Sequence, residues 1–293
     1  MDINFELYKV FYYVAKSLSF STAAAELYIS QSAVSQAIKG LEQKLNAKLF
    51  LRNTKHVQLS EAGSLLFSHV EQAFHFLKTG ERSIGELHSL EQGELKIGAS
   101  DTICKYYLLP YFKQFNLLYP KIKLNITNRP SPVCASLLKQ GLVDISVVNL
   151  SPERLYPGMT ISKGKILHDV CVASPAFSHL KDTPLSLNDI TALPILSLEK
   201  NTTTRIFLDS LFARHNLSFQ PEIQLGSIEL LIELTKIGLG TSFISREYIQ
   251  KELDDNQLFP LLLTTEIPSR ELGVLTHDCL PVSLAAQKFI ELL

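Results

Sequence analysis

Tryptophan is absent from this chain of 293 residues, and cysteine and methionine are scarce, with four and two residues respectively. The cysteines, Cys104, Cys134, Cys171 and Cys279, lie 30, 37 and 108 residues apart, so no pair has the short spacing of a zinc-binding or CxxC motif. A disulfide framework is therefore disfavoured, and we expect the thiols to be buried small apolar groups in a reducing cytoplasm.

Long hydrophobic runs are also missing, although 46% of the residues are hydrophobic. A membrane-spanning helix needs about 18–20 consecutive apolar residues, and no stretch approaches that length. The opening residues contain neither the basic nor the apolar segment of a secretory signal peptide. We therefore expect a cytoplasmic protein without a membrane contact, long enough for about two domains.

The short motifs of common enzyme classes are missing as well. The chain contains no G-x-S-x-G, H-E-x-x-H, Walker A or G-x-G-x-x-G motif. Gly238-Leu-Gly240 is only the start of a dinucleotide fingerprint, and it follows a predicted helix rather than a strand. The eight histidines are scattered. These absences predict a protein that is not an enzyme and that uses no cofactor and no metal.

Charge is nearly balanced overall, at −1, but it is distributed unevenly. Residues 1–60 carry seven bases and four acids, a net charge of +3, which leaves −4 on the remainder. A basic segment at one end is typical of a small domain that binds a polyanion, although chance clustering explains the same excess.

The same basic segment has the pattern of three helices. Apolar residues recur every three to four positions over 3–17, Ser21 is a candidate N-cap for a short helix over 22–27, and Ser30 is a candidate N-cap for a third helix over 31–45. Small alanines allow the second and third helices to approach closely. This join is typical of a helix-turn-helix unit.

The third helix has two contrasting faces. Val34, Ile38 and Leu41 would face inward, while the other face has only short or medium hydrogen-bonding side chains and no carboxylate. Glutamine, serine and lysine can pair with base edges in the major groove, although a merely solvated face has the same composition. The candidate base-contacting residues are Gln31, Ser32, Ser35, Gln36 and Lys39.

Apolar and polar residues alternate within 48–60, which predicts a two-stranded wing. Val57 and Leu59 alternate with polar residues, and Arg52 and Lys55 lie near the expected tip, where basic groups can contact the DNA backbone.

These segments resemble one known family. Phe20-Ser-Thr-Ala-Ala-Ala-Glu-Leu-Tyr-Ile-Ser-Gln-Ser-Ala-Val-Ser-Gln-Ala-Ile-Lys-Gly-Leu-Glu42, then Leu49-Phe-Leu-Arg52 and Leu59-Ser-Glu-Ala-Gly63, resemble the DNA-binding domain of LysR-type transcriptional regulators. Ser32 departs from the family pattern, which commonly has proline there; both fit a helix's first turn, so we expect the helix to be kept. The resemblance implies a winged helix-turn-helix domain over 1–60 that binds a dyad-symmetric promoter site in double-stranded DNA.

Residues 61–90 contain no proline and carry apolar residues at alternating steps of four and three. This coiled-coil seam predicts a long linker helix that pairs two protomers, with packing against its own domain as the alternative. The seam is formed by Leu66, Val70, Ala73, Leu77, Gly80, Ile84 and Leu87. The resemblance implies a homodimer that often pairs again into a homotetramer.

From Gly93 onward, predicted strands alternate with helices, which indicates an α/β domain over 91–293. We expect strands at 95–99, 122–127, 143–148, 166–173, 194–198, 222–225, 241–244 and 272–276, and helices following Ser100 and near 134–140, 203–214, 227–237 and 281–292. The family resemblance implies two lobes, like those of a periplasmic binding protein. Lobe I would cover 92–163 and 267–293, and lobe II would cover 164–266.

Polar residues follow several of these strands, where ligands bind in open α/β sheets. For each serine or threonine alone, helix capping is the alternative role. Asp101 argues against an anionic ligand unless its side chain turns away to cap. The candidate effector-binding residues are Ser100, Asp101, Thr102, Asn128, Asn149, Thr202, Thr203 and Ser227.

The sequence therefore predicts a LysR-type regulator that binds DNA and responds to a small-molecule effector held between two α/β lobes. One alternative is a solute-binding or enzymatic α/β domain whose N-terminal helices only mediate assembly. Another is a constitutive DNA-binding protein with an empty cleft.

Overall fold

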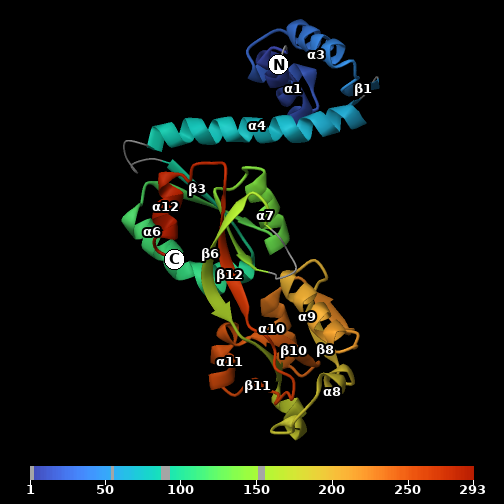
Figure 1. The fold of residues 1–293 in the computed structure, drawn as a ribbon, viewed down its shortest axis with the longest axis vertical. Coiled ribbons are helices and arrows are strands. Elements are labelled where there is room, and N and C mark those ends of the chain that lie inside the picture. Colours follow the sequence, from blue (N-terminus) through green and yellow to red (C-terminus); the bar gives the residue numbers. More distant parts are fainter. Residues whose placement is uncertain (1–2, 54–55, 87–92, 151–155) are drawn as a thin grey trace. The chain divides into compact units, whose positions relative to one another are not determined.

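The computed structural model describes residues 3–53, 56–86, 93–150 and 156–293. The chain divides into two compact units, Met1–Glu81 and Arg82–Leu293 (Figure 1). No helix in the described ranges has both the length and the apolar character needed to span a bilayer.

The first unit is built on three short helices, α1 (Phe5–Ser17), α2 (Phe20–Glu26) and α3 (Gln31–Leu45). Side chains cap all three, because the Asn4, Ser19 and Ser30 oxygens accept hydrogen bonds from the first-turn amides. The prediction of Ser30 as N-cap is confirmed. The prediction of Ser21 is wrong: Ser19 has the extended backbone of a cap and accepts from the Thr22 amide at 3.2 Å, so α2 begins two residues earlier.

The core of this unit is formed by one face of each helix. Phe11, Val14, Val34, Ile38 and Leu41 are fully buried, so the 3-to-4 periodicity identified the inner faces correctly. The predicted wing is present as the antiparallel pair β1 (Phe50–Asn53) and β2 (His56–Leu59), in which Phe50 pairs with Leu59.

Helix α4 (Glu61–Glu86) follows the wing, and its predicted seam has two different environments. Val70 is buried and Leu66 packs against the core of the first unit. Ala73, Leu77 and Ile84, further along, are exposed. The alternative of packing against its own domain therefore holds for the first half of the seam only, and Leu87 lies outside the described residues.

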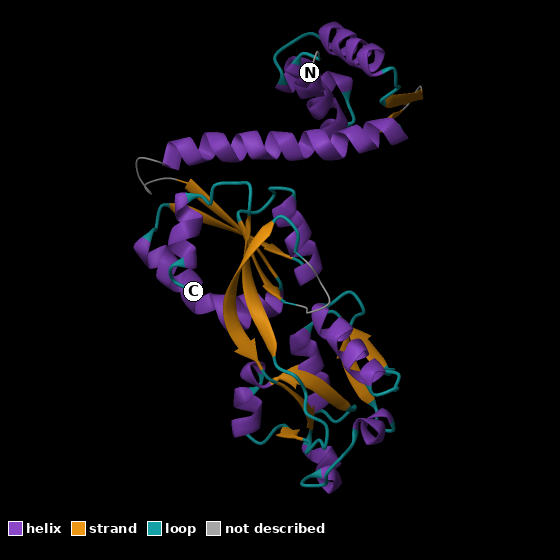
Figure 2. Cartoon of the chain, in the orientation of Figure 1, coloured by secondary structure: helices purple, strands orange, loops and turns teal. Residues whose placement is uncertain are grey.

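The second unit contains two sheets of mixed direction (Figure 2). The sheet of lobe I has the strand order β4-β3-β5-β12-β6, and that of lobe II has the order β11-β7-β10-β8-β9. The strands of lobe I are β3 (Gly93–Ala99), β4 (Ile122–Asn128), β5 (Ile145–Asn149), β6 (Met159–Leu167) and β12 (Arg270–His277). Those of lobe II are β7 (Asp169–Ala173), β8 (Ile195–Leu198), β9 (Ile223–Leu225), β10 (Thr241–Ser245) and β11 (Phe259–Pro260).

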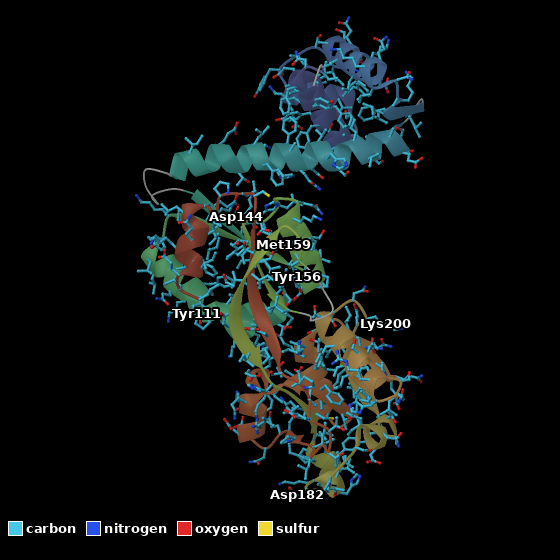
Figure 3. All side chains as sticks on the ribbon, viewed as in Figure 1. Tyr111, Asp144, Tyr156, Met159, Asp182 and Lys200 are labelled. Carbon is cyan, nitrogen blue, oxygen red and sulfur yellow. The ribbon has the colours of Figure 1, made fainter. Side chains whose placement is uncertain are left out.

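Helices cover both sheets, and their apolar side chains form the cores with the strands (Figure 3). In lobe I they are α5 (Asp101–Ile103), the π-helical turn η1 (Cys104–Leu108), α6 (Leu109–Leu118), α7 (Ser131–Lys139) and α12 (Leu284–Ile290). In lobe II they are η2 (Pro175–Leu180), α8 (Leu187–Thr191), α9 (Thr203–Arg214), α10 (Ile228–Lys236), η3 (Arg246–Tyr248) and α11 (Gln250–Asp254). The π-helical turn lies just before Pro110, which is in the first turn of α6.

The segment predicted as one strand over 166–173 is two strands in different sheets. β6 ends at Leu167, β7 begins at Asp169, and His168 between them marks the crossing from lobe I to lobe II. The expected lobe boundary after residue 163 therefore falls inside β6, because this strand stays paired with β12 through Leu167. Sequence patterns also missed α8, α11 and β11, which are too short to show a period.

Candidate functional site

The outer face of α3 has the exposure that base contacts require. Gln31, Ser32, Gln36 and Lys39 are exposed and Ser35 is half-buried, while the aliphatic side of the helix is buried in the core. The structure thus leaves this polar face open to solvent within its unit. Its contact with bases stays a prediction.

The first turn of α3 explains how serine replaces the proline common at position 32. The Ser30 hydroxyl accepts a hydrogen bond from the Ala33 amide at 3.2 Å and shares another with the Ser32 hydroxyl at 2.9 Å. Ser32 therefore supports the cap, and the helix is kept as expected.

Two further residues of this region were missed by sequence reasoning. Tyr28, in the turn between α2 and α3, is 94% exposed and has a left-handed backbone with φ of 55°. Glu42 is buried, and its carboxylate accepts hydrogen bonds from the Leu49 amide at 2.8 Å and from the Lys48 ammonium at 3.3 Å. The signal for Glu42 was its position four residues after the inward-facing Ile38. Its bonds attach α3 to the wing.

The predicted backbone contacts are placed only in part. Arg52 belongs to β1, but its side chain lies outside what the structure describes, and so does the whole of Lys55. Both remain predictions.

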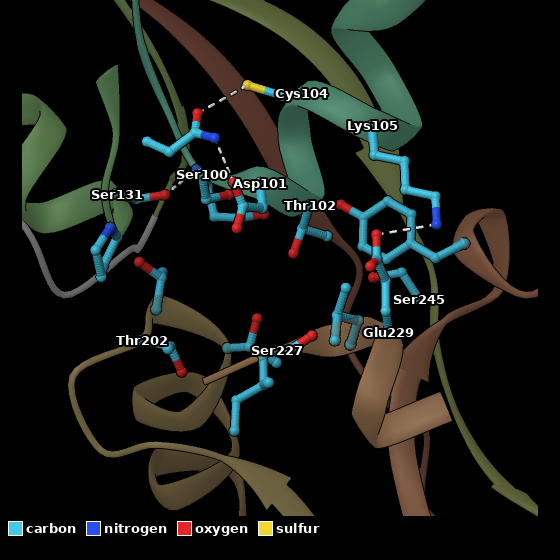
Figure 4. Close-up of a pocket in the computed structure, with 18 of the residues that line it drawn as sticks. Ser100, Asp101, Thr102, Cys104, Lys105, Ser131, Thr202, Ser227, Glu229 and Ser245 are labelled. Atoms are coloured by element: carbon cyan, nitrogen blue, oxygen red, sulfur yellow. Dashed lines mark hydrogen bonds and ion pairs between the residues drawn. The ribbon is translucent and has the colours of Figure 1, made fainter. Parts of the chain in front are cut away.

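The second unit contains a cavity of about 600 Å³ between the two lobes, and all eight predicted effector residues line it (Figure 4). This volume suits a small metabolite. Ser100, Asn128 and Asn149 lie at the carboxyl ends of the parallel strands β3, β4 and β5. Thr202 and Ser227 follow β8 and β9 of lobe II. The rule that ligands bind beyond strand carboxyl ends thus brought together residues up to 127 positions apart.

Three of these hydroxyls also cap helices. Ser100, Thr202 and Ser227 accept hydrogen bonds from the amides of Ile103, Arg205 and Leu230 at 3.4, 3.2 and 3.3 Å. Capping and lining the cavity are therefore compatible at each position.

Asp101 does not turn away as a cap. Ser100 has that role, and the Asp101 carboxylate accepts a hydrogen bond from the side-chain amide of Asn128. The Asn128 oxygen in turn receives the Cys104 thiol at 3.5 Å. The carboxylate remains exposed on the wall of the cavity (Figure 4).

Arg270, at the start of β12, was not predicted from the sequence and organises the floor of the cleft. Arg270 is buried, and its guanidinium makes a bidentate ion pair with Asp169 of β7. The guanidinium also donates a hydrogen bond to the Ser245 hydroxyl at 3.2 Å. It also donates to Asn149 of lobe I and Thr204 of lobe II, at 3.4 and 3.2 Å. Burial alone would lower the pKa of this guanidinium, but the Asp169 charge raises it, so Arg270 stays charged.

Among the described residues, two further contacts join the lobes beside the cavity. Lys105 of lobe I forms an ion pair with Glu229 of lobe II at 2.9 Å, and the hydrogen bond that its ammonium donates to Glu229 raises the pKa of Lys105 (Figure 4). The rings of Tyr106 and Tyr248 stack with their centroids 4.8 Å apart. Both contacts start from the π-helical turn η1.

Three of the four thiols, those of Cys104, Cys134 and Cys171, are poor nucleophiles. Burial raises the pKa of Cys104 to about 12, of Cys134 to about 11 and of Cys171 to about 12, so these groups stay protonated at neutral pH. The expectation that the cysteines are buried is confirmed for Cys134 and Cys171, whereas Cys104 is half-buried and Cys279 is exposed in the loop after β12. Across the described residues, no three potential metal ligands cluster together.

Comparison with known proteins agrees with this architecture. Residues 5–64 match the family described as "Bacterial regulatory helix-turn-helix protein, lysR family", and residues 88–293 match "LysR substrate binding domain". The chain belongs to the LysR family of transcriptional regulators. It therefore combines a helix-turn-helix DNA-binding domain with an effector-binding domain.

Individual relatives extend over nearly the whole chain. A probable RuBisCO transcriptional regulator of Cyanidioschyzon merolae is 29% identical over 99% of this chain and 98% of its own length. One of Porphyra purpurea is 30% identical, over 82% of this chain and 77% of its own.

Solved structures share the fold. CrgA, a LysR-type transcriptional regulator from Neisseria meningitidis, has a TM-score of 0.56 at 24% identity, over 99% of this chain and 98% of its own. The CcmR regulatory domain of Synechocystis PCC6803, in complex with 2-PG, has a TM-score of 0.61 at 20% identity, over 68% of this chain and 95% of its own.

Proposed function

We propose that this protein binds a dyad-symmetric promoter site as a cytoplasmic homo-oligomer, and that a small metabolite in the interlobe cavity controls that binding. The observation that carries the proposal is the outer face of α3, which is polar, free of carboxylates and open to solvent while its aliphatic side is buried. Gln31, Ser32, Ser35, Gln36 and Lys39 are the proposed base contacts, with Arg52 and Lys55 on the DNA backbone.

The second half of the α4 seam supports assembly. Ala73, Leu77 and Ile84 are exposed at helical spacing, which is the pattern of a surface that pairs with a second copy. A dimer places two α3 helices so that they can read two half-sites. We propose that the cavity's polar residues hold the effector. The CcmR regulatory domain, which shares this fold, is in complex with 2-PG, and this supports the proposal. The effector would then favour one lobe arrangement and thereby one DNA-binding geometry.

We propose that the protein acts by binding rather than by catalysis. Its buried thiols are protonated, and its cavity residues are engaged in caps and ion pairs rather than in a nucleophile–base pair.

The test is DNA binding by the full chain, measured by fluorescence anisotropy on its own promoter region and on scrambled DNA. We expect affinity for the promoter to fall steeply with salt and to exceed affinity for the scrambled sequence. Gln36→Ala or Lys39→Ala should each cost about 1–3 kcal/mol on the promoter and less on scrambled DNA. Gln257→Ala, an exposed glutamine of the second unit, is the matched control.

Equal affinity for both DNA molecules, unchanged by either substitution, would contradict the proposal. Deleting residues 1–60 addresses the solute-binding alternative, because a regulator then loses DNA binding while a solute-binding protein keeps its ligand.

A further inference from the structure

The charges on the cavity wall nearly cancel. The charged residues that line the cavity are Asp101, Lys105, Arg129, Glu229 and Arg270. Three of them are neutralised: Arg270 by the buried carboxylate of Asp169, and Lys105 and Glu229 by each other at 2.9 Å. Asp101 and Arg129, one of each sign, are left.

The Asp101 carboxylate accepts a hydrogen bond but has no cationic partner among the described residues. In the described part of the chain it makes no ion pair, and its partner is the neutral side-chain amide of Asn128. Arg129 is similarly exposed, and its guanidinium donates to the backbone oxygen of Asn128 at 2.7 Å. An exposed carboxylate on the wall repels a purely anionic ligand and attracts an ammonium group.

The opposite wall, in lobe II, favours negative charge. Helices α9 and α10 begin at the cavity with Thr202 and Ser227 as caps, and their first-turn N–H groups and positive dipole ends favour an anionic group (Figure 4). Tyr248 adds an independent sign of a ligand. It lines the cavity, it is 8% exposed, and its buried hydroxyl has no hydrogen-bond partner among the described residues. Such a hydroxyl is costly unless a bound group completes its bonding.

We propose that the effector is a zwitterion, an α-amino acid or a close derivative, whose ammonium group binds Asp101 and whose carboxylate faces the N-termini of α9 and α10. The inference rests on the proposed role of this cavity as the effector site. The ligand's ammonium group would therefore face lobe I, and its carboxylate would face lobe II. Because such a ligand contacts both lobes, it links lobe arrangement to occupancy.

The experiment is a thermal-shift screen of the full chain with the standard L-amino acids. For each amino acid that binds, the probes include the matching 2-hydroxy acid, which replaces the ammonium by a hydroxyl, and the matching amine, which lacks the carboxylate. We expect at least one amino acid to raise the Tm, and both analogues to bind about tenfold more weakly or worse.

Asp101→Asn keeps the hydrogen bond with Asn128 and removes the charge. It should weaken amino-acid binding by about tenfold or more and reduce the preference over the hydroxy acid. Asp255→Asn, an exposed acid on lobe II outside the cavity, should leave both unchanged.

Three results would overturn the inference: no amino acid raises the Tm, the hydroxy acid or a phosphate ester binds as well as the amino acid, or Asp101→Asn leaves the preference intact. Promoter binding measured on the same samples separates the two conclusions. If the protein binds its promoter specifically and responds to an anion, the proposed function stands and only the inference of a zwitterionic effector is wrong.

Discussion

At the residue scale, two side chains of the DNA-binding unit have effects on stability that oppose ordinary expectations for their types. Glu42 is a buried acid that stabilises, because its carboxylate satisfies wing amides and pairs with Lys48. Tyr28 is an exposed aromatic that packs on nothing and sits in a conformation that tyrosine adopts with difficulty.

Replacing Glu42 should therefore loosen the wing. Glu42→Ala leaves the Leu49 amide without its acceptor, and we expect a loss of about 1–3 kcal/mol in the free energy of unfolding. Urea denaturation measures this, with Glu26→Ala at an exposed position as the control. An equal, small effect at both positions would show that the buried carboxylate contributes nothing to the free energy of unfolding.

Replacing Tyr28 by asparagine should have the opposite sign. Asparagine tolerates the left-handed region, and no packing is lost at 94% exposure, so we expect a gain of up to about 1 kcal/mol. Tyr28→Phe keeps the backbone restriction and should change the urea midpoint little. A destabilised Tyr28→Asn protein would contradict this account of the turn.

At the element scale, α4 combines two roles along one apolar seam. Its first half is part of the core of the first unit through Val70, and its second half presents Leu77 and Ile84 to solvent. The same apolar periodicity therefore continues through a buried and an exposed surface of α4, and only the burial seen in the structure distinguishes the two.

Substitutions in the two halves should have different consequences. Val70→Ala removes buried methyl groups and should lower the free energy of unfolding by about 1–3 kcal/mol. Leu77→Ala should leave the unfolding midpoint of dilute protein nearly unchanged and weaken self-association. Light scattering over a concentration series measures association, and an unaltered oligomer in Leu77→Ala would exclude this half of the seam as the pairing surface.

At the scale of the whole effector domain, the chain crosses between lobes at His168 and again before Arg270, and polar contacts secure both crossings. The His168 ring contacts the Glu247 carboxylate at 2.7 Å, and the His168 amide donates to the same group. Arg270 and Asp169 form the buried pair beside it.

The His168 contact predicts a dependence on pH. Burial would raise the pKa of Glu247, but hydrogen bonds from His168 outweigh it and hold this pKa below the ordinary 4.5. A lowered acid pKa contributes stability above pH 4.5 that is lost as the pH falls through the folded-state pKa. His168→Ala should therefore lower the Tm at neutral pH, and the loss in the free energy of unfolding should be less than about 1 kcal/mol because the pair is partly exposed.

Thermal unfolding at neutral pH and below pH 4 is the measurement. The difference between His168→Ala and the unaltered chain should shrink at the lower pH. A difference that is constant across that range would mean that the ring, and not the ionised carboxylate, supplies the stability.

The sequence by itself determined the helix-turn-helix, the wing, the polar face of α3 and the helix-strand order of the second unit. These depend on periodicity and capping, which act between residues a few positions apart. It also identified eight of the polar residues that line the cavity, because strand ends in an open α/β sheet are predictable from the strands themselves.

Only the tertiary structure decided which partners those residues meet. The Glu42–wing bonds, the Arg270–Asp169 pair, the Lys105–Glu229 bridge and the exposed Asp101 carboxylate depend on side chains that folding brings together. The end of β6 at Leu167 likewise depends on its pairing with β12, about a hundred residues away. Charge balance in the cavity is such a long-range property, and it arises when two lobes face each other.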